Sequence, residues 1–169
     1  MGLDFDILAS EVEALIVSEP DEIANFSNIS ALLFHALNQE LDNAVNWLGF
    51  YRVRNGELIL GPFQGQVACL RIPYGSGVCG VAAKEEKTLV VDDVEQFPGH
   101  IACDSASKSE IVIPVKNADN QMIAILDVDS SELKTFNEII AKGLEKCIEK
   151  FKRPTPPEPP ARKIKHAKH

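Results

Sequence analysis

Apolar residues recur every three or four positions in three stretches of the chain, the pattern of an amphipathic helix. The first two helices are expected at residues 4–18, which end before Pro20, and at residues 21–44, which begin at a helix-capping aspartate. The third is expected at residues 131–151, near the C-terminus. Cys147 lies on the apolar stripe of this last helix, so we expect it to fill the core and to take no part in chemistry.

Short apolar runs between these helices predict strands. Asn55-Gly56 stands between the runs 46–53 and 57–61, and an Asn-Gly pair in this setting is the strongest short-range signal of a β-hairpin. The mixture predicts an α+β fold with a mostly antiparallel central sheet flanked by helices. The remaining strands are expected at 67–72, 88–92, 110–115 and 122–128, and a short helix at 81–84.

Composition divides the chain into a body and a tail. Residues 152–169 hold five of the ten prolines, with six basic side chains and one acidic one, whereas residues 1–151 hold 11 basic and 24 acidic side chains. A body with a net charge of −13 is a poor candidate for binding nucleic acid, which needs a basic surface. We expect residues 1–151 to form one domain, and the tail to be extended and disordered. A solvated tail is favoured over one that binds an SH3-like groove or an acidic surface.

Cellular location is indicated by what the sequence lacks. It contains no apolar run near the ~20 residues that a membrane span needs. The acidic, amphipathic N-terminus does not resemble a secretory signal. Four cysteines in such a chain argue against a disulfide scaffold, so we expect a cytoplasmic protein whose thiols are reduced at rest and which does not bind a membrane.

Three cysteines stand outside the predicted helical cores. Cys103 lies in a run of small polar residues before a strand, and Cys69 and Cys79 lie in other loop-like stretches. Redox chemistry needs a nucleophilic thiolate, a resolving thiol and an exposed loop, and Cys103 with either Cys69 or Cys79 meets these demands. A zinc site that adds His100 is the alternative, but no Cys-x₂-Cys knuckle is present, so we expect no metal.

Acidic residues end the last predicted strand. Asp127 and Asp129 should share a face with Ile123 and Ile125, because alternate residues of a strand point the same way. Carboxylates on a buried face are costly unless they are paired or solvated. Together with Glu110, which opens the preceding strand, they suit a cationic group such as an amine, and a shared proton would let one of them act as an acid.

Two aromatic residues of the first predicted strand should also share a face. Trp47 and Tyr51 flank Gly49 at alternate positions. They either pack in the core or wall a pocket with a hollow over the glycine, and the residues alone favour the core. The glycine-rich turn at residues 73–80 could hold a phosphate or carboxylate on free N–H groups, but it lacks the P-loop and dinucleotide patterns.

The chain resembles the free methionine-(R)-sulfoxide reductases, which are single GAF-domain enzymes. Many segments match this family in one order, and the resemblance covers about residues 5–150, leaving only the tail outside. The matching segments are residues 46–51, 60–65, 68–72, 77–80, 97–107, 109–114 and 126–130.

The resemblance implies a role for each of the three cysteines. Cys103 matches the nucleophile, Cys69 the main resolving cysteine and Cys79 an auxiliary one. It further implies thioredoxin as the reductant, no bound cofactor, and a protein that is often a homodimer. A different class, a GAF module that senses a small molecule without catalysis, is the alternative, although no effector domain is attached in these 169 residues.

The resemblance also implies a substrate site. Glu110, Asp127 and Asp129 match the acids that hold the amine and the sulfoxide oxygen of free methionine-(R)-sulfoxide. Trp47 and Tyr51 match the walls around its methyl-sulfur end.

Overall fold

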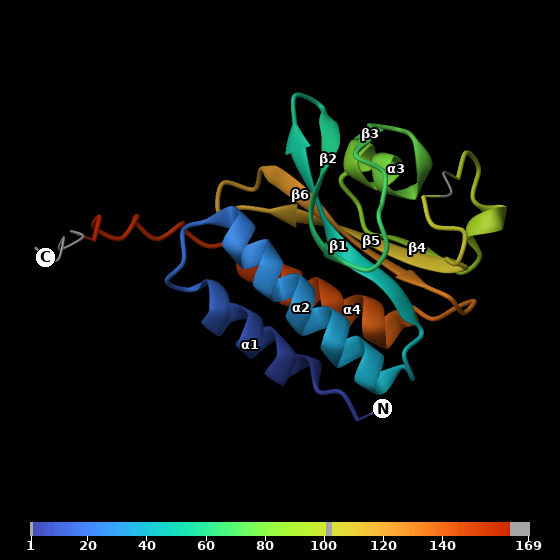
Figure 1. The fold of residues 1–169 in the computed structure, drawn as a ribbon, viewed down its shortest axis with the longest axis horizontal. Helices are drawn as coiled ribbons and strands as arrows, with labels where there is room; N and C mark the ends of the chain where they lie inside the picture. The colour runs from blue at the N-terminus through green and yellow to red at the C-terminus, as the bar shows by residue number, and fades with distance from the viewer. Residues whose placement is uncertain (1, 101–102, 163–169) are drawn as a thin grey trace, which may run out of the picture.

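The structure, a computed structural model, describes residues 2–100 and 103–162. Its centre is one antiparallel sheet of six strands in the order β3-β2-β1-β6-β5-β4 (Figure 1). Strands β1 and β6 occupy the middle and carry the residues that matter most below. The strands are β1 (Val45–Arg54), β2 (Glu57–Gln64), β3 (Arg71–Pro73), β4 (Leu89–Val91), β5 (Ser109–Lys116) and β6 (Met122–Ser130).

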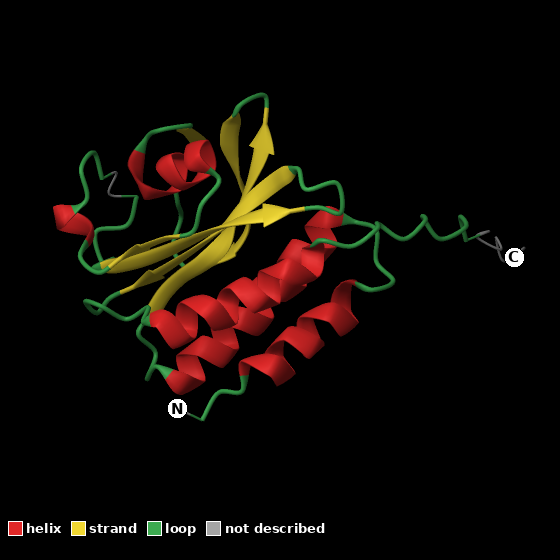
Figure 2. Ribbon diagram, turned by 180° about the vertical axis from the view of Figure 1, so that it is seen from behind, coloured by secondary structure: helices red, strands yellow, loops and turns green. Residues whose placement is uncertain are grey.

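Helices cover both faces of this sheet (Figure 2). Helices α2 (Glu22–Glu40) and α4 (Glu138–Ile148) pack on one face, with α1 (Phe5–Ile16) packed outside them, and the short α3 (Gly77–Glu85) lies on the other face. The α+β prediction, with a central antiparallel sheet and flanking helices, is therefore confirmed. In the part of the chain described here, every helix is too short or too polar to cross a lipid bilayer.

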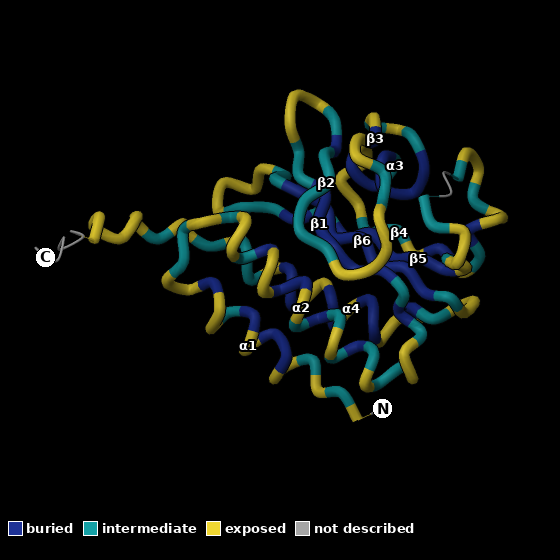
Figure 3. The backbone as a smooth tube through the Cα atoms, in the orientation of Figure 1, coloured by how far each residue is buried: buried dark blue, intermediate teal, exposed yellow. Residues whose placement is uncertain are grey.

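From Trp47 onward, alternation along β1 separates two apolar cores. Leu48 and Phe50 point into the larger core under the three helices, where Phe50 stacks on Phe26 with ring centroids 4.3 Å apart. Trp47 and Tyr51 point into the smaller core beneath α3. Figure 3 shows the central strands as mostly buried, whereas α1, α2 and α4 alternate between buried and exposed positions.

The space over Gly49 is filled. Gly49 lies opposite Phe63 of β2, and a Cβ built on the glycine would stand 2.3 Å from the Phe63 Cβ. Phe63 stacks on Trp47 with centroids 5.2 Å apart. Of the two alternatives, the hollow over Gly49 is wrong and the favoured core packing of Trp47 and Tyr51 is confirmed, since the missing side chain lets the neighbouring strand approach.

Several element boundaries differ from the expectation. Of the strand expected at 67–72, only residues 71 and 72 pair with the sheet, and residue 73 extends this pairing. Helix α2 ends at Glu40 because Asp42 and Asn43 adopt left-handed backbone, with φ of 51° and 60°. Helix α4 begins only at Glu138, where the Asn137 side chain accepts a hydrogen bond from a first-turn N–H.

The start of β6 also differs. Ile123 packs against the helical core, whereas Ile125 faces the smaller core. A register shift between Val115 and Lys116, next to the beginning of β6, breaks the alternation there. The expectation that both isoleucines share a face with Asp127 holds for Ile125 alone.

The described part of the tail starts beside α1. Arg153 Nη2 lies 3.1 Å from Glu13 Oε1, and residues 154–162 form neither helix nor strand. The tail then leads away from the body (Figure 1). Residues 163–169 of the predicted tail lie outside the described residues, and its disorder stays a prediction.

Candidate active site

A cavity of about 40 Å³ lies between α3 and the face of the sheet opposite the three long helices. Its walls come from the first turn of α3, from strands β1, β5 and β6, and from the segment that leads into β5. Six of the eight residues expected at a site belong to this lining, which brings together positions between 51 and 129. They are Tyr51, Cys79, Cys103, Glu110, Asp127 and Asp129.

Strand register places the three acids side by side. Glu110 of β5 pairs with Asp129 of β6, and Asp127 lies two residues earlier on the same face of β6. Because β6 is a central strand, these carboxyls lie deep in the molecule, and they are only 6–8% exposed. The two alternate acids at the end of β6 therefore form one buried acidic cluster together with Glu110.

Burial raises the pKa of all three carboxyls, because it disfavours the charged form. For Glu110 and Asp129, repulsion from the nearby Asp127 carboxylate raises the pKa further. None of the ion pairs among the described residues involves these acids. The cluster thus has a deficit of positive charge, and its carboxyls keep their protons to higher pH than ordinary carboxyls do.

The Cys79 thiol belongs to the same cluster. Cys79 lies in the first turn of α3, and its Sγ donates to Glu110 Oε2 across 3.7 Å. Burial, followed by the Asp127 and Glu110 charges, raises its pKa well above the usual value. This thiol is therefore protonated and weakly nucleophilic in the cavity. The expectation of a loop position for Cys79 is wrong, because the helix begins at Gly77.

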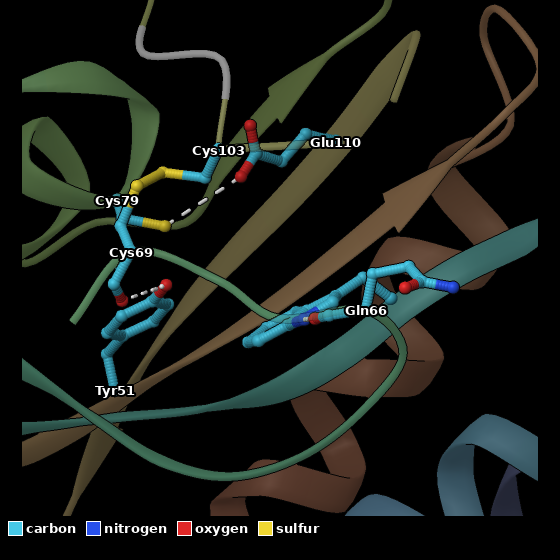
Figure 4. The surroundings of a disulfide bond; sticks show 7 residues. Tyr51, Gln66, Cys69, Cys79, Cys103 and Glu110 are labelled. Atoms are coloured by element: carbon cyan, nitrogen blue, oxygen red, sulfur yellow. Dashed lines mark hydrogen bonds between the residues drawn. A yellow bond between two sulfur atoms is a disulfide. The ribbon is translucent and has the colours of Figure 1, made fainter. Parts of the chain in front are cut away.

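Cys69 and Cys103 form a disulfide (Figure 4), with Cα atoms 5.6 Å apart, and Cys103 lines the cavity. Cys79 and Cys147 are free and buried, and Cys147 lies in the helical core as expected. The two cysteines of the bridge are 34 positions apart in the sequence. With both of them oxidised, the Cys₃His zinc site considered above cannot form in this state.

Two aromatic side chains of β1 hold the segment that carries Cys69. The Tyr51 hydroxyl donates to the Cys69 carbonyl at 3.0 Å (Figure 4), and Trp47 Nε1 donates to the Gln66 carbonyl at 3.0 Å. The Gln66 and Cys69 carbonyls, which a neighbouring strand would otherwise pair, are thus bonded by side chains. The segment can therefore leave the sheet without leaving these carbonyls unpaired. Trp47 stacks on Tyr51 at 5.8 Å and supports it from outside the cavity lining.

Asn46 of β1 anchors the segment that carries Cys103. Its Nδ2 donates to Asp104 Oδ2 at 3.0 Å and to Ser107 Oγ at 3.1 Å. The Asp104 carboxylate also accepts the N–H of Ala106, which tightens the turn after the cysteine. The residue patterns alone gave no reason to single out Asn46, because nothing local shows that β1 runs beside this loop.

The cavity has further lining residues that were not predicted as site residues. His100, Asp104 and Ser107 come from the segment before β5. Ser76 and Gly77 come from the start of α3, where the serine side chain makes no capping bond. The glycine-rich turn was the only signal for this end of the cavity. It leaves unbonded N–H groups at a helix N-terminus, a setting that attracts an anion.

Comparison with known proteins identifies relatives of this whole architecture. The family model described as "GAF domain" matches residues 24–145. The "Free methionine-R-sulfoxide reductase" of Escherichia coli is 41% identical over 146 residues, which cover 86% of this chain and 85% of that protein.

Two solved structures agree with this match. The structure of fRMsr of Staphylococcus aureus in its reduced form has a TM-score of 0.79 and 44% identity, and covers 88% of this chain and 93% of that one. The free methionine-R-sulfoxide reductase from Neisseria meningitidis, solved in complex with its substrate, has a TM-score of 0.81 and 39% identity, with 90% of each chain covered.

Proposed function

This chain belongs to the free methionine-R-sulfoxide reductase family of GAF-domain enzymes, and from that premise we propose that it reduces free L-methionine-(R)-sulfoxide to methionine by a thiol cycle. One observation carries the proposal. The Cys69–Cys103 disulfide borders, through Cys103, a cavity that is also lined by three buried carboxyls without an ion pair among the described residues. Such a site combines a two-electron redox couple with a receptor for an amine.

The first chemical step belongs to Cys103. Its thiolate attacks the sulfoxide sulfur while a protonated carboxyl of the cluster gives a proton to the sulfoxide oxygen. The oxygen then moves as hydroxide from the substrate sulfur to the Cys103 sulfur, which breaks the S–O bond and the newly formed S–S bond, so that Cys103 becomes a sulfenic acid and methionine leaves. The raised pKa values of Glu110 and Asp129 support this step, because a carboxyl must still hold its proton at neutral pH to donate it.

Cys69 closes the cycle. Its thiolate attacks the Cys103 sulfenic acid, water is released, and the disulfide forms. The bridge seen between these two cysteines supports Cys69 as the resolving thiol, with Cys79 in an auxiliary role. The cavity in the bridged state is far smaller than the several hundred cubic ångströms typical of ligand sites, as expected after product has left.

The substrate binds through both charged ends of a free amino acid. Its ammonium group pairs with Glu110, Asp127 and Asp129, which removes the charge deficit of the cluster. Its carboxylate accepts from the first-turn N–H groups of α3, at Gly77 and Val78. Tyr51 and, behind it, Trp47 form the wall beside the methyl-sulfur end.

The reaction needs an external reductant and a reducing compartment. Each turnover consumes two electrons, and thioredoxin reduces the disulfide directly by thiol exchange without a bound cofactor or metal. The free, buried thiols of Cys79 and Cys147 suit the reducing cytoplasm. A homodimer, and the absence of nucleic-acid and membrane partners, stay predictions, which the molar mass in solution and binding assays will test.

Two cysteine variants test the cycle. Cys103→Ser should abolish turnover with thioredoxin, because this thiol alone meets the sulfoxide, whereas Cys147→Ser should remain active. Cys69→Ser should stop cycling but still release about one methionine per protein in a quenched reaction, the stoichiometry of one sulfenic acid. Substantial activity of Cys103→Ser would refute the assignment. Substrate binding without turnover by the native chain would favour a sensory GAF module.

A further inference from the structure

Cys79, Glu110 and Asp127 have the geometry of a metal-ion site. Each offers one ligand atom, and these atoms all lie within 4.8 Å of one another. The Cys79 Sγ to Glu110 Oε2 separation is 3.7 Å. A tetrahedral zinc ion with ordinary Zn–S and Zn–O bonds places its sulfur and oxygen ligands about 3.6 Å apart. The side chains would therefore need little movement to take up an ion between them.

An unpartnered oxygen indicates that the cluster is open to a ligand. Asp127 Oδ1 is buried and, among the described residues, has no hydrogen-bond partner. Asp127 is only 6% exposed, and that exposed part lines the cavity. A buried carboxylate oxygen without a partner costs roughly 1–3 kcal/mol or more. Cys79 and Glu110 retain 6% exposure each and line the same cavity, so an ion can reach all three side chains from solvent.

We propose that this cluster binds one thiophilic divalent cation, of which Zn²⁺ is the physiological example, through Cys79 Sγ and one oxygen each of Glu110 and Asp127. On binding, the thiol and any protonated carboxyl release their protons to solvent, and the thiolate and two carboxylates, with three negative charges together, more than neutralise the two positive charges of the ion. Three protein ligands leave the fourth position to solvent. Mg²⁺ and Ca²⁺ prefer sites built from oxygen ligands alone, so the thiolate selects against them.

The cation occupies the place that the substrate amine would take, a consequence that rests on the proposed function. Glu110 and Asp127 cannot serve both ligands at once, so a loaded cluster blocks the free amino acid. The ion is thus an inhibitor rather than a cofactor, and the affinity of this site would set how much free zinc the enzyme tolerates.

Direct binding to the disulfide form of the full-length protein tests the site without any turnover. In this form Cys69 and Cys103 are unavailable, and Cys79 and Cys147 are the remaining thiols. Cd²⁺, a zinc substitute, should produce a thiolate-to-metal charge-transfer absorption that saturates at one ion per chain. Zn²⁺, but not Mg²⁺, should displace it.

Matched variants locate the ligands. Cys79→Ser should abolish the absorption, whereas Cys147→Ser should retain it in full. Glu110→Gln and Asp127→Asn should each weaken Cd²⁺ affinity at least tenfold, and Asp119→Asn on an exposed turn should not change it. The proposal is wrong if no absorption appears, if Cys79→Ser retains it, or if neither carboxyl variant weakens binding. Because no substrate is present, these outcomes are independent of whether the chain reduces a sulfoxide.

Discussion

Glu110 and Asp129 lie directly opposite each other on β5 and β6, with both carboxyls on the buried face beneath α3. Like charges in this position of an antiparallel pair destabilise a sheet. The raised pKa of each group relieves the repulsion, because the protonated form is neutral and can donate a hydrogen bond. A stable fold would avoid such a pair, so its presence indicates a ligand that compensates it.

We predict that Glu110→Gln stabilises the free protein while it damages the enzyme. The amide keeps the shape of the side chain and removes one of the clustered acids. We expect a gain of about 1 kcal/mol at pH 7.5, or roughly 2–4 °C in Tm for a chain of this size. Thermal unfolding in the presence of EDTA measures it. Glu138→Gln, on the exposed side of α4, is the control and should change Tm little.

This gain should depend on pH. Folding raises the pKa of Glu110 above its ordinary value of 4.5, so the folded chain holds this proton more tightly than the unfolded one. The stability from this group is complete below the unfolded pKa and is lost as pH rises towards the folded pKa. The advantage of Glu110→Gln should therefore be small at pH 4 and grow above pH 4.5. An advantage that is constant with pH would contradict this explanation.

Tyr51→Phe should slow the second half of the thiol cycle. The variant loses the hydrogen bond from the hydroxyl to the Cys69 carbonyl, which positions the resolving segment. A bond of this kind is worth about 1 kcal/mol, or roughly fivefold in the rate of disulfide formation. Quenched single-turnover reactions with thiol labelling measure that rate. Tyr74→Phe, whose hydroxyl makes no bond to this segment, should form the disulfide at the native rate, and equal slowing in both variants would refute the role.

Removal of the tail should leave catalysis intact. Truncation after Arg153 removes residues 154–169, of which the described residues 154–162 form neither helix nor strand. We expect kcat/KM to stay within about twofold, a change of under ~0.5 kcal/mol. Truncation after Phe151 also removes the pair between Arg153 and Glu13, so it should lower stability by up to about 1 kcal/mol, again with kcat/KM nearly unchanged. A large fall in kcat/KM in either protein would show that the tail acts at the site.

Much of the site could be predicted from local patterns. The period of two along β6 placed Asp127 and Asp129 on one face, and pairing with β5 then brings Glu110 to them. Tyr51 was placed on the correct face of β1 by the same rule. The rule failed at Ile123, because a register shift is set by the neighbouring strand and leaves no mark in the alternation itself.

What escaped prediction depends on contacts between distant segments. Asn46 holds the loop of Cys103 through Asp104 and Ser107, which are 58 and 61 positions away. Phe63 of the adjacent strand occupies the space over Gly49, where a pocket was one alternative. The cavity lies under α3 instead. Only the resemblance to a family pointed to Cys69 rather than Cys79 as the main partner of Cys103. The residue types alone fitted either thiol.

The central claim is that the buried acids recognise the free amine of methionine-(R)-sulfoxide. The direct measurement is kcat/KM for the free amino acid, for its N-acetyl derivative and for the S epimer, with thioredoxin as reductant. Acetylation removes the positive charge and leaves Glu110, Asp127 and Asp129 desolvated without a partner, at roughly 2–5 kcal/mol. We therefore expect kcat/KM for the acetylated substrate to fall about a hundredfold or more, with the S epimer also disfavoured. Equal turnover of the free and acetylated R-sulfoxides would show that the acids do not bind the free amine, and would contradict the proposed substrate.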